Sequence, residues 1–264
     1  MSAANFGDVW KHNVLLEVVN LIRKENFNYV ETHGNYDNHT VTHNGSAPLG
    51  YYYLSKKYNY SLPSTLYTQI NNPPTSAARY SYLSSWMQVY DLLKKSQIKS
   101  FKETIFEINQ SVCTAVAPHI SNHTEICYTH GNGFTGVLNL TNSPDLVFID
   151  PFYTKAPVTE MKRVKELASK LDQKSVPYLI WYPIYRSQIR SKRIKTHLLD
   201  QFPHGARRPH RLELHDISNN KNSSHIPITG MIFSDTLSHY IQTVKTNLNY
   251  LDSSKNPCLN WSIV

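Results

Sequence analysis

The alternation of short apolar segments with longer segments of helical period is the feature that most constrains the fold of this chain. Apolar segments of strand length lie at 27–31, 102–108, 125–129, 146–150 and 177–184. Segments 8–23, 82–95 and 158–171 instead repeat apolar residues every three or four positions, as a half-buried helix does. Strands that alternate with helices are typical of a parallel sheet covered on both faces. We therefore predict an α/β, Rossmann-like fold with a mostly parallel sheet and helices on both faces.

The region that follows the first expected strand differs in composition from the rest. Residues 34–48 are rich in Asn, His, Gly, Thr and Ser and are expected to be irregular, whereas 50–70 is aromatic and reads as helical. In an uninterrupted dinucleotide-binding fold, a ribose-binding acid follows the first strand after about 20 residues, and here the distance is much longer. We predict a helical insertion at 46–82, within a domain made of 1–45 and 83–264.

The last third of the chain reads as a basic helix at 186–199, a strand-rich end and a final helix. The whole chain has 27 Lys and Arg against 19 Asp and Glu, a formal charge of +8. This balance favours a polyanionic partner, although charge alone does not separate nucleic acid from an anionic membrane or from simple solubility. The sequence begins without a signal-peptide pattern and has no long apolar run, and its cysteines are few and widely spaced. We expect a soluble, cytoplasmic protein with no membrane partner.

An acid stands where the buried strand at 146–149 ends, in the stretch LVFIDPFY. The exocyclic amine of adenine is a poor nucleophile, and hydrogen bonds to a carboxylate and a backbone carbonyl favour pyramidal geometry at its nitrogen. Asp150 can supply the carboxylate, Pro151 the carbonyl and Tyr153 a stacking ring, with proline fixing the direction of the carbonyl. The alternative is that Asp150 caps a helix and the aromatic rings pack locally.

Other polar residues also follow expected strands. His33, Glu107 and Asn132 each stand at or just beyond the end of a strand. Ligands bind beyond the carboxyl ends of the strands in parallel sheets, so these residues should meet Asp150 in one crevice.

Short motifs spread over nearly the whole chain resemble the RlmJ family of bacterial 23S ribosomal RNA adenine-N6 methyltransferases. In chain order they are N-x-x-D-V-x-K-H (5–12), THG (32–34), TIFEI (104–108), NGF (132–134), IDPFY (149–153), IWYP (180–183), TGMI (229–232) and WSIV (261–264). Each motif is short, but their order and spacing together are specific. The resemblance implies a class I methyltransferase that uses S-adenosyl-L-methionine and acts on 23S ribosomal RNA.

The resemblance also assigns roles to individual residues. The cofactor-binding positions that it implies are His12, His33, Ser85, Glu107, Asn132 and Gly133. Asp150, Pro151 and Tyr153 would hold the target adenine. Lys11 of the K-H pair, with Arg186 and Arg190 of the basic helix, would bind the RNA, although a basic helix face is also commonly just solvated.

The sequence departs from the family pattern at several positions, among them Asn132, which stands where the family has Asp. The family's T-H-A-G-x-G loop is replaced by THGNYD at 32–37, which keeps one glycine of two, and Phe152 replaces the second proline of Asp-Pro-Pro-Tyr. The alternatives are therefore a non-catalytic RNA-binding protein of the same fold, or a methyltransferase of DNA adenine. Histidines 33, 39 and 43 lack carboxylates at a metal-ligand spacing, so no metal is expected. We expect a monomer.

Overall fold

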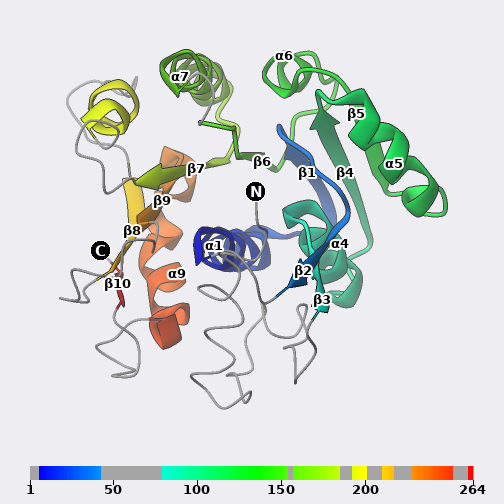
Figure 1. Ribbon diagram of the computed structural model, residues 1–264, viewed down its shortest axis with the longest axis horizontal. Coiled ribbons are helices and arrows are strands. Elements are labelled where there is room, and N and C mark those ends of the chain that lie inside the picture. The colour runs from blue at the N-terminus through cyan, green and yellow to red at the C-terminus, as the bar shows by residue number, and fades with distance from the viewer. Residues whose placement is uncertain are drawn as a thin grey trace.

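The computed structural model describes residues 6–42, 79–153, 157–184, 192–200, 210–216, 228–251 and 261–263. These residues form one large sheet with helices on both faces and a small two-stranded ribbon (Figure 1). In this part of the chain, no helix is long and apolar enough to cross a membrane.

The large sheet has eight strands in the order β10-β8-β9-β7-β6-β1-β4-β5. Their bounds are β1 (Asn26–Glu31), β4 (Ser100–Glu107), β5 (Ile126–His130), β6 (Leu146–Ile149), β7 (Tyr178–Ile184), β8 (His210–Asp216), β9 (Ile228–Phe233) and β10 (Trp261–Ile263). The neighbouring strands β5, β4, β1, β6 and β7 pair in parallel, while β9 is antiparallel to both of its neighbours, β7 and β8. This is the Rossmann-like sheet of class I methyltransferases, with its antiparallel hairpin, so the predicted fold class is confirmed.

Strand β6 shows why the central strands read as continuous apolar runs. All four of its residues are buried, and their side chains alternate between the two hydrophobic cores of the protein. Leu146 and Phe148 belong to one core, whereas Val147 and Ile149 belong to the other. A strand covered on both faces needs apolar residues at every position, because each side chain lies between the sheet and a helix.

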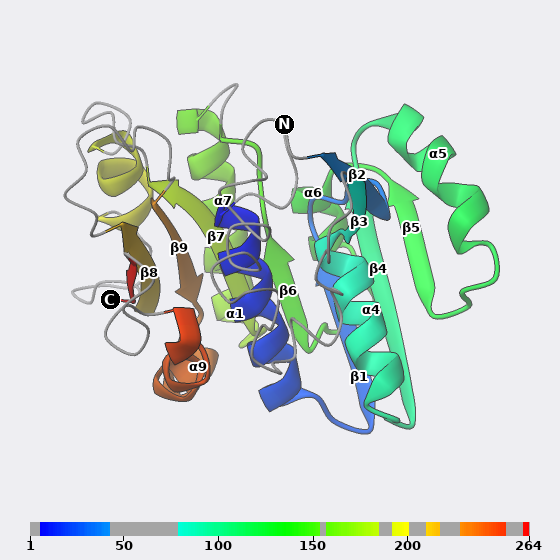
Figure 2. The same cartoon turned by 60° about the horizontal axis from the view of Figure 1, so that its bottom comes forward.

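The helices divide between the two faces of the sheet, as Figures 1 and 2 show. One face carries α1 (Phe6–Ile22), α4 (Ser85–Lys95) and α9 (Ile241–Asn247), and the other carries α6 (Gly133–Leu138) and α7 (Pro157–Gln173). Short helical turns η3 (Asp235–Tyr240) and η4 (Asn249–Leu251) flank α9, and α5 (Gln110–Ile120) packs on β5 and β4. Helix α1 contacts α4, α9 and β9, so the first helix of the chain covers the centre of the sheet.

Two local predictions are wrong around the expected insertion. Residues 38–42, expected to be irregular, form β2 (Asn38–Thr42), which pairs antiparallel with β3 (Arg79–Leu83). The helix predicted from residue 82 therefore begins only at Ser85. Strand pairing joins segments far apart in the sequence and depends on packing, which a local pattern does not reveal.

Helix α5 has no counterpart among the predicted elements. It contains Pro118 near its end and several β-branched or small residues, which weaken a helical pattern. Its start is fixed by Asn109, whose side chain accepts a hydrogen bond from the backbone N–H of Ser111.

Parts of two other predictions fall outside the described residues. Of the expected insertion at 46–82, only the residues of β3 are described, so the predicted domain division stays a prediction. Of the expected basic helix at 186–199, residues 192–194 are helical and continue into η2 (Lys195–Leu199), a π-helical turn. Arg186 and Arg190 lie outside the described residues.

Candidate active site

The segments that follow β1, β4, β5 and β6 meet at one edge of the sheet, where the strand order changes direction around β1. The backbone N–H of Thr32 donates to the carbonyl of Phe148 at 3.0 Å, and that of Gly34 donates to the carbonyl of Phe106 at 2.6 Å. The N–H of Gly131 donates to the carbonyl of Glu107 at 2.9 Å. The structure therefore brings together the strand ends that carry His33, Glu107, Asn132 and Asp150. This is the position at which parallel α/β sheets bind ligands.

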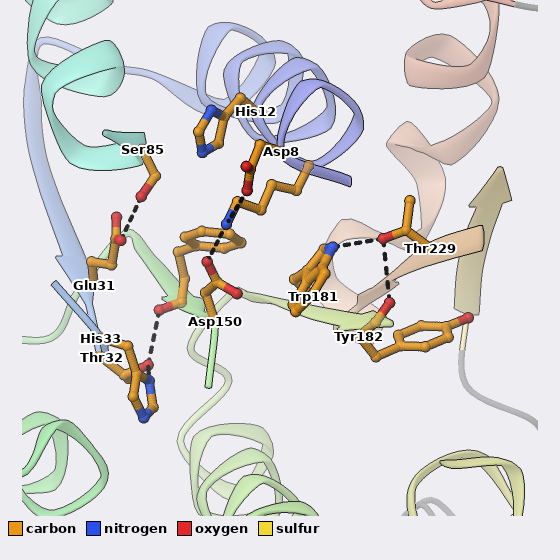
Figure 3. A network of polar contacts seen from close by, with 12 residues as sticks. Asp8, His12, Glu31, Thr32, His33, Ser85, Asp150, Trp181, Tyr182 and Thr229 are labelled. Atoms are coloured by element: carbon orange, nitrogen blue, oxygen red, sulfur yellow. Dashed lines mark hydrogen bonds and ion pairs between the residues drawn. The ribbon is translucent and has the colours of Figure 1, made fainter. Parts of the chain in front are cut away.

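Asp150 is held by an ion pair with the first helix of the chain (Figure 3). The Lys11 ammonium donates to Asp150 Oδ2 at 2.6 Å and lies 3.1 Å from Asp8 Oδ1. It also lies 5.3 Å from the ring centroid of Trp181. Burial alone would lower the pKa of Lys11, but the carboxylates of Asp150 and Asp8 raise it above its ordinary value, so the ammonium stays charged. Asp150 is not a helix cap, because the next described helix, α7, begins only at Pro157.

The two aromatic residues after Pro151 have opposite environments. Tyr153 is only 2% exposed, its hydroxyl donates to the carbonyl of Trp181 at 3.0 Å, and its ring belongs to the core beneath α7. Phe152 is 49% exposed. The ring predicted to stack on the substrate base is thus buried, whereas the ring beside it faces the solvent.

His12 is a buried, neutral histidine. Its Nδ1 lies 2.8 Å from the hydroxyl of Tyr82 and 2.7 Å from Nε2 of Gln88, and its ring stacks on Tyr82 at 5.6 Å between centroids. Burial and the nearby charge of Lys11 lower the pKa of His12 well below its ordinary value. The residue therefore does not bring a positive charge to the site.

Ser85 is bound to a carboxyl group that the sequence reasoning missed. Its hydroxyl donates to Glu31 Oε1 at 2.5 Å, and the hydroxyl of Tyr29 donates to Glu31 Oε2 at 2.8 Å (Figure 3 shows the first contact). Glu31 is 1% exposed, and this burial raises its pKa to about 8. The sequence carried the signal for Glu31, since this acid ends an apolar strand just as Asp150 does.

Glu107 and Asn132 stand at the ends of neighbouring strands, and both already bind backbone groups. Glu107 Oε1 accepts from the N–H of Asn109 at 2.7 Å, and burial raises the pKa of Glu107. Asn132 Oδ1 accepts from the N–H groups of Phe134 and Thr135, so it caps α6. This cap explains the side chain without reference to any ligand.

Gly133 also has a structural explanation. A Cβ atom added at this position would lie 1.9 Å from the carbonyl oxygen of Thr32. The first turn of α6 therefore touches the backbone of the loop after β1, and only glycine permits this approach.

The loop at 33–37 is held in place by side chains of β5 and α4 that bind its backbone. The hydroxyl of Tyr128 and the indole N–H of Trp86 both donate to the carbonyl of Asn35, at 2.9 and 3.3 Å. A Cβ atom at Gly34 would lie 2.7 Å from the hydroxyl of Tyr128 and 2.8 Å from Cγ2 of Ile105, so a larger residue here would have to displace these side chains. The hydrogen bonds from Tyr128 and Trp86 thus anchor the loop to β5 and α4.

His33 belongs to the loop after β1 and contacts α6 and α7, the helices on the face of the sheet opposite α1. Its Nδ1 is 2.7 Å from the hydroxyl of Thr32, and its ring contacts the edge of Phe134 at 4.9 Å between centroids. Its Nε2 lies 3.8 Å from Glu160 of α7. The predicted cofactor ligand is thus placed among the ends of β1, α6 and α7.

The residues at this edge fit the chemistry of S-adenosylmethionine. Glu107 Oε1 at the end of β4 already accepts from the N–H of Asn109, but the two carboxylate oxygens keep further lone pairs that can accept from the hydroxyls of a ribose. Asn132 at the next strand and His33 at the end of β1 add polar groups on either side. Among the residues that the structure describes, no cluster of His, Cys, Asp and Glu could hold a metal ion.

The sheet order and the antiparallel β9 are those of the class I methyltransferase fold. No protein-family model and no curated protein matches the chain. Among solved structures, it is similar to the protein LPL1258 of Legionella pneumophila, described with the family model DUF519, at 19% identity and a TM-score of 0.71. That likeness covers 99% of this chain and 97% of the other, and it establishes the fold alone.

Two further likenesses are weaker. An rRNA methylase from Streptococcus thermophilus is 10% identical, with a TM-score of 0.39, over 85% of this chain and 94% of the other. A putative methyltransferase from Streptococcus mutans in complex with SAH is 11% identical, with a TM-score of 0.40, over 85% and 95%. These TM-scores are too low to bear on the function of this chain.

Proposed function

We propose that this protein is an S-adenosylmethionine-dependent methyltransferase that methylates N6 of an adenine in 23S ribosomal RNA. The observation that carries the proposal is the carboxylate of Asp150, which follows β6 beside the point where the strand order reverses and is held by Lys11 at 2.6 Å. The motifs of the sequence resemble the RlmJ family, and DUF519, which describes LPL1258, designates that family. The structural likeness itself supports only the fold, so the assignment of the substrate depends on the motifs.

The residues around Asp150 suit transfer to an amine. S-adenosylmethionine, when bound, supplies an electrophilic methyl group on sulfur. Lys11 occupies Oδ2 of Asp150, and we assign Oδ1 to a hydrogen of the adenine amine, with the carbonyl of Pro151 as the second acceptor. These two bonds direct the nitrogen lone pair away from the acceptors. As the new N–CH3 bond forms, the S–CH3 bond of the sulfonium would break and leave a neutral thioether; the amine becomes cationic, and Asp150 accepts the proton that it loses.

The proposed cofactor residues are those of the strand ends. Glu107 accepts the ribose hydroxyls, while Asn132 and Gly133 lie beside the adenine of the cofactor. His12, His33 and Ser85 complete the set on the side of α1 and β1. The RNA is held by Lys11, Arg186 and Arg190, which agrees with the formal charge of +8 of the chain. In this proposal the protein acts as a monomer.

Substitution of Asp150 by Asn tests the assignment. Asn keeps the size of the side chain but cannot take the proton, so we expect methyl transfer to fall by about 100-fold or more, a typical contribution of general acid–base catalysis. The assay follows labelled methyl groups from the cofactor into protein-free 23S ribosomal RNA. Calorimetry on the same variant should give unchanged cofactor binding, and full activity of Asp150→Asn would refute the role of the carboxylate.

Asp145→Asn is a matched control at the opposite end of β6. Its carboxylate pairs with Lys24 at 2.6 Å and accepts from the N–H of Asn28 at 2.8 Å, far from the strand ends that form the site. This variant should transfer methyl groups at the wild-type rate.

The labelling assay and the calorimetry together test the two alternatives, a DNA adenine methyltransferase and a non-catalytic RNA-binding protein. Labelling of duplex DNA in preference to 23S ribosomal RNA would identify a DNA adenine methyltransferase. Absence of calorimetric heat at millimolar cofactor, together with RNA binding, would identify a non-catalytic RNA-binding protein.

A further inference from the structure

The aromatic residues next to Asp150 are arranged in a way that the motif alone does not suggest. A base that lies against Asp150 and Pro151 needs a ring with an accessible face. Tyr153 offers none in this structure, because it is 2% exposed and lies in the core with Val147, Ile149 and Val164.

Exposure of the Tyr153 ring would disturb several contacts at once. The ring would have to leave the core beneath α7, and its hydroxyl would lose the bond of 3.0 Å to the carbonyl of Trp181. Removal of a large side chain from a packed core leaves a cavity, and loss of a partner leaves a polar group unsatisfied. The ring therefore acts as a support for the segment after β6.

Phe152 has the properties that Tyr153 lacks. Its ring is 49% exposed, and it follows Asp150 and the buried Pro151 directly in the chain. A single exposed apolar residue is common on protein surfaces and needs no explanation by itself. Its position matters more, because Pro151 restricts the backbone between the carboxylate and the ring. Tyr153, anchored in the core, fixes the same segment from the other side.

We propose that Phe152, and not Tyr153, provides the ring on which the substrate adenine stacks while Asp150 holds its amine. The inference rests on the proposed function and refines it. The substrate adenine must then lie outside any base stack, as it can in a single-stranded loop or bulge of RNA, because only an unstacked base can present a face to an exposed ring. Stacking of a base on an aromatic ring is tolerant of sequence, so Phe152 adds affinity, while the contacts to the amine select adenine.

The first experiment measures binding without chemistry. The full chain is titrated into a fluorescein-labelled single-stranded oligoadenylate, with anisotropy as the readout and no cofactor present. We expect Phe152→Ala to bind about tenfold more weakly than the wild type, as loss of one stacked base predicts, and Phe152→Trp to keep wild-type affinity. Val158→Ala is the control, because Val158 is 43% exposed on α7 and should leave affinity unchanged.

The second experiment measures methyl transfer to protein-free 23S ribosomal RNA. Phe152→Ala should raise KM for RNA by about tenfold, and calorimetry should give an unchanged Kd for S-adenosylmethionine. Phe152→Trp should keep the wild-type KM, which a purely structural role of Phe152 would not predict.

The outcomes distinguish this inference from the proposed function. If the wild type methylates RNA and Phe152→Ala keeps its affinity and KM, the stacking role is wrong and the methyltransferase stands. If the wild type transfers no methyl group but binds oligoadenylate in a manner that depends on Phe152, the stacking role stands and the proposed function is wrong. If it neither methylates RNA nor binds oligoadenylate, both are wrong.

Discussion

At the scale of single residues, the site depends on a carboxylate and an ammonium that come from opposite parts of the fold. Lys11, which we propose to contact RNA, also forms ion pairs with Asp150 and Asp8. Both side chains of the Lys11–Asp150 pair are mostly buried, with 13% and 14% exposed. In this position Lys11 determines which oxygen of Asp150 is available to a substrate.

Substitution of Lys11 by Met, which keeps the stem and removes the charge, tests this role. The expected result is a fall in kcat for methyl transfer by about 10–100-fold, since a hydrogen bond to a charged group contributes roughly 1.5–3 kcal/mol. Cofactor affinity, measured by calorimetry, should change little. Lys24→Met is the control, because Lys24 forms a 2.6 Å pair with Asp145 but is 63% exposed, and exposed pairs contribute little. Equal effects of the two substitutions would argue against a special role for Lys11.

The sequence could locate Asp150 but not its surroundings. An acid after four buried residues is visible in the sequence, whereas the pairing with Lys11 depends on how α1 packs across the sheet. The same limitation applies to Tyr153, whose burial depends on Trp181 of the next strand. Glu31 could have been found, since it obeys the same rule as Asp150.

At the scale of elements, the loop after β1 and the start of α6 are packed directly against each other. Gly133 touches the carbonyl of Thr32, and Asn132 caps the helix that Gly133 begins. Both residues were predicted from the family resemblance to bind the cofactor. The structure gives them a second task, which is to hold two segments of the site together.

The contact at Gly133 predicts a large effect of a small substitution. A methyl group at this position would lie 1.9 Å from a backbone oxygen, so Gly133→Ala must displace α6 or the loop. We expect the free energy of unfolding in urea to fall by about 1–3 kcal/mol. Gly131→Ala provides the comparison, because a Cβ atom there has nothing within 4 Å and should cost little. A wild-type midpoint for Gly133→Ala would show that the approach is looser than the structure indicates.

Most strands and helices of the sheet were predictable, and the exceptions share a cause. The apolar runs of β1, β6 and β7 and the helical period of α1 and α7 are local patterns. Strands β2 and β3 exist because they pair with each other, and Tyr82 of β3 is buried against His12. Such non-local contacts leave only a weak trace in the sequence.

At the scale of the whole molecule, buried carboxyl groups should make stability depend on pH. Burial raises the pKa of Glu31 to about 8 from an ordinary value of 4.5, and that of Glu103 also rises. The folded state thus binds these protons more tightly than the unfolded state does. The contribution of these protonated carboxyl groups to stability is therefore largest below pH 4.5, and the part that comes from Glu31 is lost as the pH rises from 4.5 through about 8. The pKa values of His12 and His39 are lowered, so these residues reduce stability only below about pH 6.5, the ordinary pKa of histidine.

Substitution of Glu31 by Gln isolates this effect. For the wild type, Glu31 should lower the free energy of unfolding by about 1–2 kcal/mol between pH 6.5 and pH 8. Urea unfolding at both values should show a smaller difference for Glu31→Gln. Glu125→Gln should keep the wild-type difference, because the pKa of Glu125 is lowered, mainly by Lys94, and its charge is constant in this range. An unchanged difference in Glu31→Gln would place the titration elsewhere.

The ion pair between Lys11 and Asp150 also has a consequence for how each chain is made. Its partners are 139 positions apart, and β1 lies in the sheet between β4 and β6, which come later in the chain. On the ribosome, α1 and β1 emerge before any strand beside which β1 lies in the sheet has been synthesised. Contacts of such long separation slow folding. A nascent chain can pair β1 with β4 and pack α1 on α4 first, but β1 lacks its second neighbour and Lys11 lacks Asp150 until β6 and Asp150 have left the exit tunnel, so the site can form only after that point.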